Sequence, residues 1–153
     1  MIALLLGARV DFASIAEADA KVPERPGVSR YDFAPRFAGR RDDPDVRAER
    51  MEAETVTLLA GPRAPILARC EGNYLEKTVK EHRLDAIREI LEVWGPDDFA
   101  WEDMHAYIDE MDARATEMLR THWSAVEVVA EALLDRARLD GVAIGQIAGI
   151  GLP

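Results

Sequence analysis

The sequence has few of the residues on which most recognisable protein sites depend. Its 153 residues include one cysteine and three histidines. A single cysteine, Cys70, cannot form an intramolecular disulfide, which excludes a disulfide scaffold and fits a reduced, cytoplasmic setting. Cys70 follows Leu67 in a stretch typical of a helix, so we expect a small buried apolar side chain there and not a reactive thiol.

The sequence also lacks an excess of basic residues and any long apolar run. Lysine and arginine number 19 against 29 aspartates and glutamates, a net charge of −10, which argues against a nucleic-acid partner. The apolar residues 1–6 have no basic region before them and are too few for a signal peptide or a membrane span. We therefore expect a cytoplasmic chain with no membrane partner. Its 48% hydrophobic content suffices for one domain over residues 1–153.

Helical periodicity dominates the second part of the chain. Asp43 and Pro44 are typical of an N-cap and first turn, and Gly61 with Pro62 predicts the end of that helix at Ala60. Further helical stretches are expected over residues 63–70, 75–94, 101–122, 126–138 and 142–148. The longest apolar stripe comprises Trp101, Met104, Ile108, Met111, Ala115, Met118 and His122. We expect it to form an intramolecular core; the alternative is the seam of a homo-oligomer.

The first 33 residues contain the signals for strands. Residues 1–6 followed by Gly7 resemble the last turn of a helix with a glycine C-cap, the beginning of which is missing. Residues 10–15 and 28–33 are rich in strand formers, and Tyr31 and Phe33 would share one face of the second strand. The sequence thus predicts a mainly α fold with a small β element of two or three short strands.

Candidate chemistry is sparse. The chain contains no nucleophile elbow, phosphate-binding glycine loop, Cys-x-x-Cys or H-E-x-x-H motif. His105, Asp109 and Asp112 fall on one helix face and could hold a metal, but neighbouring acidic residues favour a solvated acidic face. His122 continues the apolar stripe, which favours a structural role at a junction between helices. His82 is the histidine that we expect to face a cleft.

Three segments in order resemble the peptidase domain of FtsH-type ATP-dependent zinc metalloproteases. Residues 2–15 look like the end of the zinc-binding helix, its glycine and the strand after it. Residues 54–64, with Leu-Leu-Ala-Gly, are similar to the family's helix behind the active site. Residues 119–141 resemble its C-terminal helices and the glycine after them. The resemblance implies a helical FtsH-peptidase-like domain that acts on protein or peptide.

The resemblance also identifies what the chain lacks. In the family, H-E-x-x-H supplies two zinc-binding histidines and a glutamate base, and Met1 begins after the place where these residues would lie. By order, Asp85 matches the family's third zinc ligand; the alternative is a surface carboxylate paired with Arg88 or Arg83. Zinc would be the cofactor if the helix exists upstream, and no cofactor is expected for this chain.

Two explanations of the missing histidines remain open. H-E-x-x-H could be encoded in frame before Met1, or the protein could be a non-catalytic relative. The expected function is therefore a metallopeptidase-like protein that is catalytically incomplete as given. The alternative is a helical protein-interaction or dimerisation module without chemistry.

Overall fold

The computed structural model describes residues 1–19, 22–34, 36, 43–69, 73–94 and 101–150. The chain divides into two compact units. The first unit comprises Met1, residues 3–39 and residues 122–153, and the second comprises Ile2 and residues 40–121. A single domain over the whole chain stays a prediction, and each unit is described by itself.

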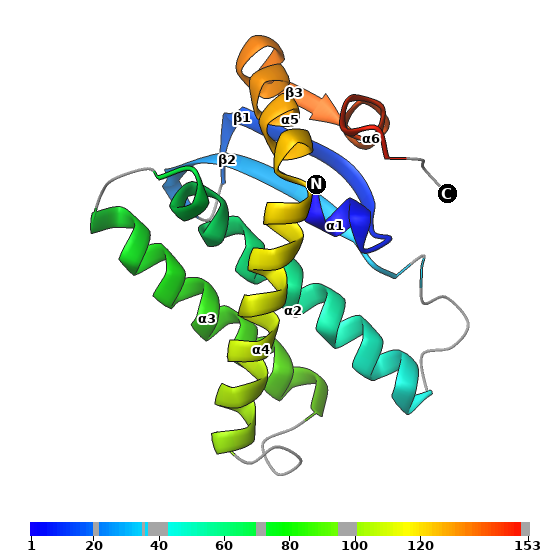
Figure 1. Ribbon diagram of the computed structural model, residues 1–153, viewed down its shortest axis with the longest axis vertical. Coiled ribbons are helices and arrows are strands. Elements are labelled where there is room, and N and C mark those ends of the chain that lie inside the picture. Colours follow the sequence, from blue (N-terminus) through cyan, green and yellow to red (C-terminus); the bar gives the residue numbers. More distant parts are fainter. Residues whose placement is uncertain (20–21, 35, 37–42, 70–72, 95–100, 151–153) are drawn as a thin grey trace. The chain divides into compact units, whose positions relative to one another are not determined.

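Within the described residues the fold is mainly α, with a small antiparallel sheet, as the sequence predicted (Figure 1). In chain order the elements are α1 (Ile2–Leu5), β1 (Arg9–Asp19), β2 (Val22–Asp32), α2 (Pro44–Leu67), α3 (Asn73–Trp94), α4 (Trp101–Thr121), α5 (Trp123–Arg136), β3 (Arg138–Asp140) and α6 (Gly141–Ala148). No helix in the described part of the chain is long and apolar enough to cross a membrane.

The first unit is built on a three-stranded sheet in the order β2-β1-β3. β1 pairs antiparallel with both neighbours, and Ala13 lies opposite Ser29 on β2 and Leu139 on β3. β1 and β2 are longer than expected, since each has 11 residues and β2 includes Pro23 and Pro26. The ring centroids of Tyr31 and Phe33 lie 5.8 Å apart in an edge-to-face arrangement, which confirms that the two side chains lie on the same face.

The expected glycine cap at the end of the first helical turn is confirmed. Gly7 adopts a left-handed conformation, with φ +83°. Its amide donates to the Leu4 carbonyl, and the Ala8 amide donates to the Ala3 carbonyl, so two of the last carbonyls of α1 are satisfied. The chain then enters β1 at Arg9.

The α5–β3–α6 segment contributes the rest of the first unit's core. Leu4, Val129, Leu139 and Ile144 form a buried cluster, which partly buried side chains of β1, α5 and α6 surround. Asp140 caps α6, because its side chain accepts a hydrogen bond from the Ala143 amide at 2.8 Å. β3 and α6 therefore follow one another without a loop. The third strand had no clear sequence signal, since only three residues form it.

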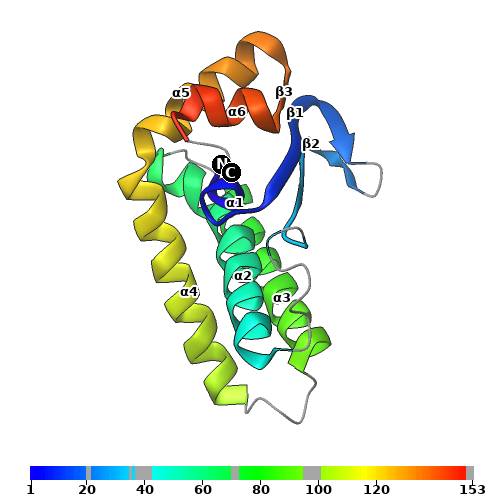
Figure 2. The same ribbon diagram turned by 90° about the vertical axis from the view of Figure 1, so that its right-hand side faces the viewer.

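The second unit contains α2, α3 and α4, and α2 packs against both of the others (Figure 2). The middle of the apolar stripe of α4 is buried, with Met104, Ile108, Met111 and Ala115 at most 3% exposed, and Met118 is half-buried. Val56 and Leu59 of α2 are also buried. The stripe is therefore intramolecular core, as expected, and these residues do not form an exposed dimer seam.

The predicted end of α2 at Ala60 is wrong. Asp43 caps the helix by accepting from the Asp45 amide, as expected, but the helix continues through Gly61, Pro62 and Pro65 to Leu67. An internal proline costs a helix about 3 kcal/mol. Tertiary contacts offset that cost here, because the Pro62 side chain is buried and Arg63 forms an ion pair with another helix.

Candidate functional site

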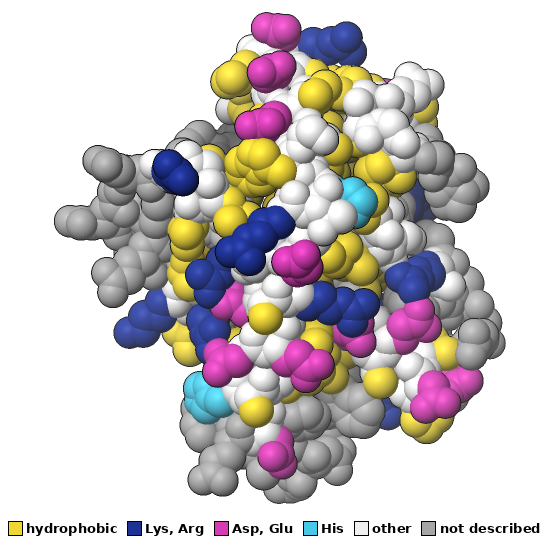
Figure 3. Space-filling view, viewed as in Figure 1, with side chains coloured by type: hydrophobic (Ala, Val, Ile, Leu, Met, Phe, Trp, Pro, Cys, Tyr) yellow, Lys and Arg dark blue, Asp and Glu magenta, His cyan; other side chains and the backbone are white. Residues whose placement is uncertain are grey.

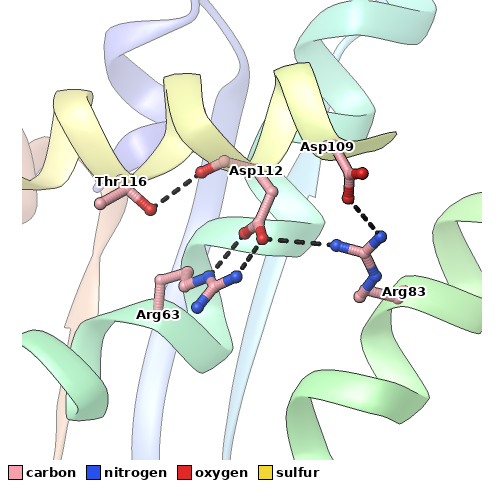
Figure 4. A network of polar contacts seen from close by, with 5 residues as sticks. All are labelled: Arg63, Arg83, Asp109, Asp112 and Thr116. Atoms are coloured by element: carbon pink, nitrogen blue, oxygen red, sulfur yellow. Dashed lines mark hydrogen bonds and ion pairs between the residues drawn. The ribbon is translucent and has the colours of Figure 1, made fainter. Parts of the chain in front are cut away.

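Four charged side chains from three helices form an ion-pair network within the second unit (Figure 4). Arg63 comes from α2, Arg83 from α3, and Asp109 and Asp112 from α4. Asp109 and Asp112 are three residues apart and therefore lie on one face of α4. The network thus connects all three helices of this unit.

Asp112 is the centre of the network. The residue is only 7% exposed, and both of its carboxylate oxygens accept from Arg63. Arg63 Nε lies 2.6 Å from Asp112 Oδ1, and Arg63 Nη2 contacts Asp112 Oδ2. This bidentate geometry matches the guanidinium fork to the carboxylate and gives strong, charge-assisted hydrogen bonds.

The guanidinium of Arg83 contacts both aspartates. Its Nη2 lies 2.6 Å from Asp109 Oδ1, and its Nη1 lies 3.5 Å from Asp112 Oδ2. Asp112 also interacts through its backbone, because Thr116 Oγ1 donates to the Asp112 carbonyl oxygen at 2.9 Å. Two arginines therefore face two aspartates, and the network carries no net charge.

These contacts change the acidity of the groups. The hydrogen bond that Arg63 donates to Asp112 raises the pKa of the Arg63 guanidinium, because it stabilises the charged form. The hydrogen bond from Arg83, followed by the positive charge of that residue, lowers the pKa of the Asp109 carboxyl. Asp109 is therefore ionised across the physiological pH range, as the ion pairing requires.

The metal hypothesis for His105, Asp109 and Asp112 receives no geometric support. Among the described residues, no group of three or more histidine, cysteine, aspartate or glutamate side chains could hold a metal ion. Asp112 is committed to Arg63 and Arg83, and His105 is exposed. A metal ion would have to displace an arginine from a buried carboxylate.

The expected solvated acidic face is correct for Asp109 but wrong for Asp112. The exposed face of α4 carries both charge signs (Figure 3), from Asp103, Asp109, Glu110, Arg114, Glu117 and Arg120. Asp112 lies four residues after Ile108, which is fully buried, and therefore faces the packed side of the helix. A carboxylate at such a position requires a partner, because burying an unpaired charge is costly.

Asp85 lies on α3 and makes the contact that the alternative interpretation predicts. Its Oδ1 accepts from Arg88 Nη1 at 2.9 Å, and its side chain is 43% exposed. Such an exposed pair between residues i and i+3 is worth little stability. A role of Asp85 as a zinc ligand stays a prediction.

The remaining candidate residues are placed as follows. His82 is half-buried on α3. His122 separates α4 from α5 and has a non-helical backbone, as expected for a junction between helices. Cys70 lies outside the described residues.

Sequence reasoning missed both arginines of the network. Arg63 was assigned to a separate short helix after a break, and Arg83 was considered only as a partner of Asp85. The available signal was the position of Asp112 on the apolar side of its helix, which calls for a cation on a neighbouring element. The identity of that cation could not be read, because Arg63 is 49 residues away along the chain.

No model of a known protein family matches this chain, and no curated protein matches it either.

Proposed function

We propose that this chain is a metallopeptidase-like domain of the FtsH type that engages protein or peptide segments without cleaving them. The observation that supports the proposal is the path of the chain at its start. A helical turn ends at the left-handed Gly7, and strand β1 begins at Arg9, which is the order on which the resemblance rests. The Leu-Leu-Ala-Gly segment is helical as well, with Leu59 and Ala60 buried.

The proposed lack of catalysis follows from the residues themselves. A zinc peptidase needs three protein ligands and a general base, and H-E-x-x-H supplies two of those ligands and the base. The motif is absent from these 153 residues. Asp85 could supply one ligand at most, so this chain would not activate a water molecule for hydrolysis. We place the protein in the cytoplasm, in keeping with its single cysteine.

Hydrolysis and binding assays test the two halves of the proposal separately. The chain is incubated with zinc and a fluorogenic unfolded protein, with and without a chelator. We expect no hydrolysis, and turnover that the chelator abolishes would contradict catalytic incompleteness. Binding is measured as the fluorescence anisotropy of a labelled unstructured peptide. A saturable rise in anisotropy is expected, and its absence at high micromolar protein would contradict a peptidase-like role.

The codons before Met1 provide an inexpensive further test. An in-frame H-E-x-x-H would make the natural protein a complete zinc peptidase, in which Asp85 is the candidate third ligand. Replacement of Asp85 by Ala in that longer protein should then abolish zinc binding. The matched change Asp103→Ala, at an exposed acidic residue of α4, should leave zinc binding intact.

A further inference from the structure

The last two turns of α2 are weakened by their own backbone. Pro62 and Pro65 lack the amide protons that an uninterrupted helix would direct at the carbonyls of Leu58 and Gly61. Two helical hydrogen bonds are therefore missing within a few residues. The same segment begins with Gly61, and glycine destabilises a helix because its backbone loses the most conformational entropy on folding.

Apolar burial in this segment is greatest at its start, and residues 64, 65 and 67 are only half-buried. Pro62 is buried, whereas Gly61 and Ala68 are exposed and Ile66 is 39% exposed. The preceding turns differ, because Val56 and Leu59 are at most 1% exposed. Hydrophobic contacts thus stabilise the body of α2 far more than residues 61–68.

The ion pair between Arg63 and Asp112 stabilises residues 61–68, where backbone hydrogen bonds are missing and apolar contacts are few. Arg63 lies between the two prolines, and it binds both carboxylate oxygens of a buried residue on α4. This contact connects residues 61–68 to a helix whose Met104, Ile108, Met111 and Ala115 are buried.

Arg83 lowers the free-energy cost of breaking the Arg63–Asp112 ion pair. Its Nη1 lies 3.5 Å from Asp112 Oδ2, and its other contact, to Asp109, is exposed. If Arg63 withdraws, Arg83 can turn from Asp109 toward Asp112, so the buried carboxylate keeps a cation. Asp112 is therefore placed between two alternative arginine partners from two different helices, α2 and α3.

We propose that residues 61–68 of α2 form a switch segment that opens independently of the rest of the helix, and that the Arg63–Asp112 ion pair is the latch that keeps it closed. Opening would expose Arg63 and the buried face of Pro62 and leave the packed part of α2 in place. The inference goes beyond the peptidase-like proposal and does not depend on it.

Hydrogen–deuterium exchange of the full chain tests the latch. Arg63→Gln keeps much of the side-chain length but removes the charge. We expect it to speed exchange of the amides of residues 63, 64 and 66–69 by about tenfold or more, the equivalent of one lost hydrogen bond to a charged group. Amides of residues 48–58 should keep their protection. The matched control Arg114→Gln breaks the exposed ion pair with Glu52, which joins the same two helices. It should leave residues 63–69 unchanged.

Two results would overturn the proposal. One is an equal rise of exchange over residues 48–58 and 63–69, which would mean that α2 opens as a whole. The other is an equal effect of the two arginine variants. Pro65→Ala, which restores an amide proton opposite the Gly61 carbonyl, serves if Arg63→Gln does not fold. It should slow exchange of residues 66–69 without changing residues 48–58, and unchanged exchange in both regions would also overturn the proposal.

Discussion

Gly141 packs directly against the backbone of Val10: a Cβ atom on Gly141 would lie 1.9 Å from the Val10 carbonyl oxygen. Gly141 is the first residue of α6, and Val10 belongs to β1. No side chain larger than hydrogen fits between them without a shift of the backbone. The close approach of α6 to the sheet therefore depends on this one glycine.

We predict that Gly141→Ala lowers the free energy of unfolding by about 2 kcal/mol or more, because one backbone must move away from the other. Helix propensity alone would give the opposite sign, since alanine is favoured over glycine in helices by about 0.5–1 kcal/mol. Urea denaturation measures the change. Gly149→Ala is a suitable comparison, because Gly149 has φ +67° but open space around it. It should cost only about 1–2 kcal/mol. A stabilised Gly141→Ala variant would contradict the packing described.

The buried carboxylate of Asp112 should contribute much more to stability than the exposed carboxylate of Asp109. We expect Asp112→Asn to lower the free energy of unfolding by about 2–4 kcal/mol, because Arg63 loses its bidentate partner in a partly buried site. Asp109→Asn, on the same helix face, should change the stability little. Equal effects of the two substitutions in urea denaturation would argue against the central position of Asp112.

The pKa of Asp109 should depend on Arg83. Because the folded state lowers the pKa of Asp109, the pair stabilises the protein above the ordinary aspartate pKa, and this contribution is lost as pH falls through the lowered value. We expect Arg83→Gln to raise the pKa of Asp109 toward the ordinary aspartate value. Carboxyl carbon NMR titration measures it directly. Arg88→Gln, which removes the partner of Asp85, is the control and should leave Asp109 unchanged.

The apolar stripe of α4 should behave as core in solution. Ile108 is fully buried, so Ile108→Ala should cost about 2–5 kcal/mol. Leu134, which is 76% exposed on α5, should tolerate the same change within about 0.5 kcal/mol. Polar substitutions at Met104, Ile108 and Met111 should unfold the second unit. A well-folded protein with a smaller mass by light scattering would instead indicate a dimer seam.

Much of the secondary structure was predictable because its signals are local. Asp43 and Pro44 begin α2 as expected, and Gly7 ends the first helical turn. The stripe on α4 correctly indicated both a helix and its buried face. Each of these signals acts through capping, backbone sterics or side-chain periodicity within a few residues.

The candidate site was predictable only in part. The sequence indicated that Asp109 and Asp112 share a helix face, but it suggested metal chemistry or a solvated surface for both. Their different burial depends on how α4 is rotated against α2 and α3. The partner arginines lie 49 and 26 residues away from the aspartates that they bind, so no local pattern identifies them.

The sequence by itself therefore determined where most helices begin, which face of α4 is apolar and that the fold is mainly helical. Only the tertiary structure decided that α2 passes through Pro62 and Pro65, that residues 138–140 add a third strand to β1, and that Asp112 binds Arg63. The physical reason is the range of the forces involved. Caps and periodicity act between neighbours in the chain, whereas burial of Pro62, strand pairing and the ion pair depend on segments that only folding brings together.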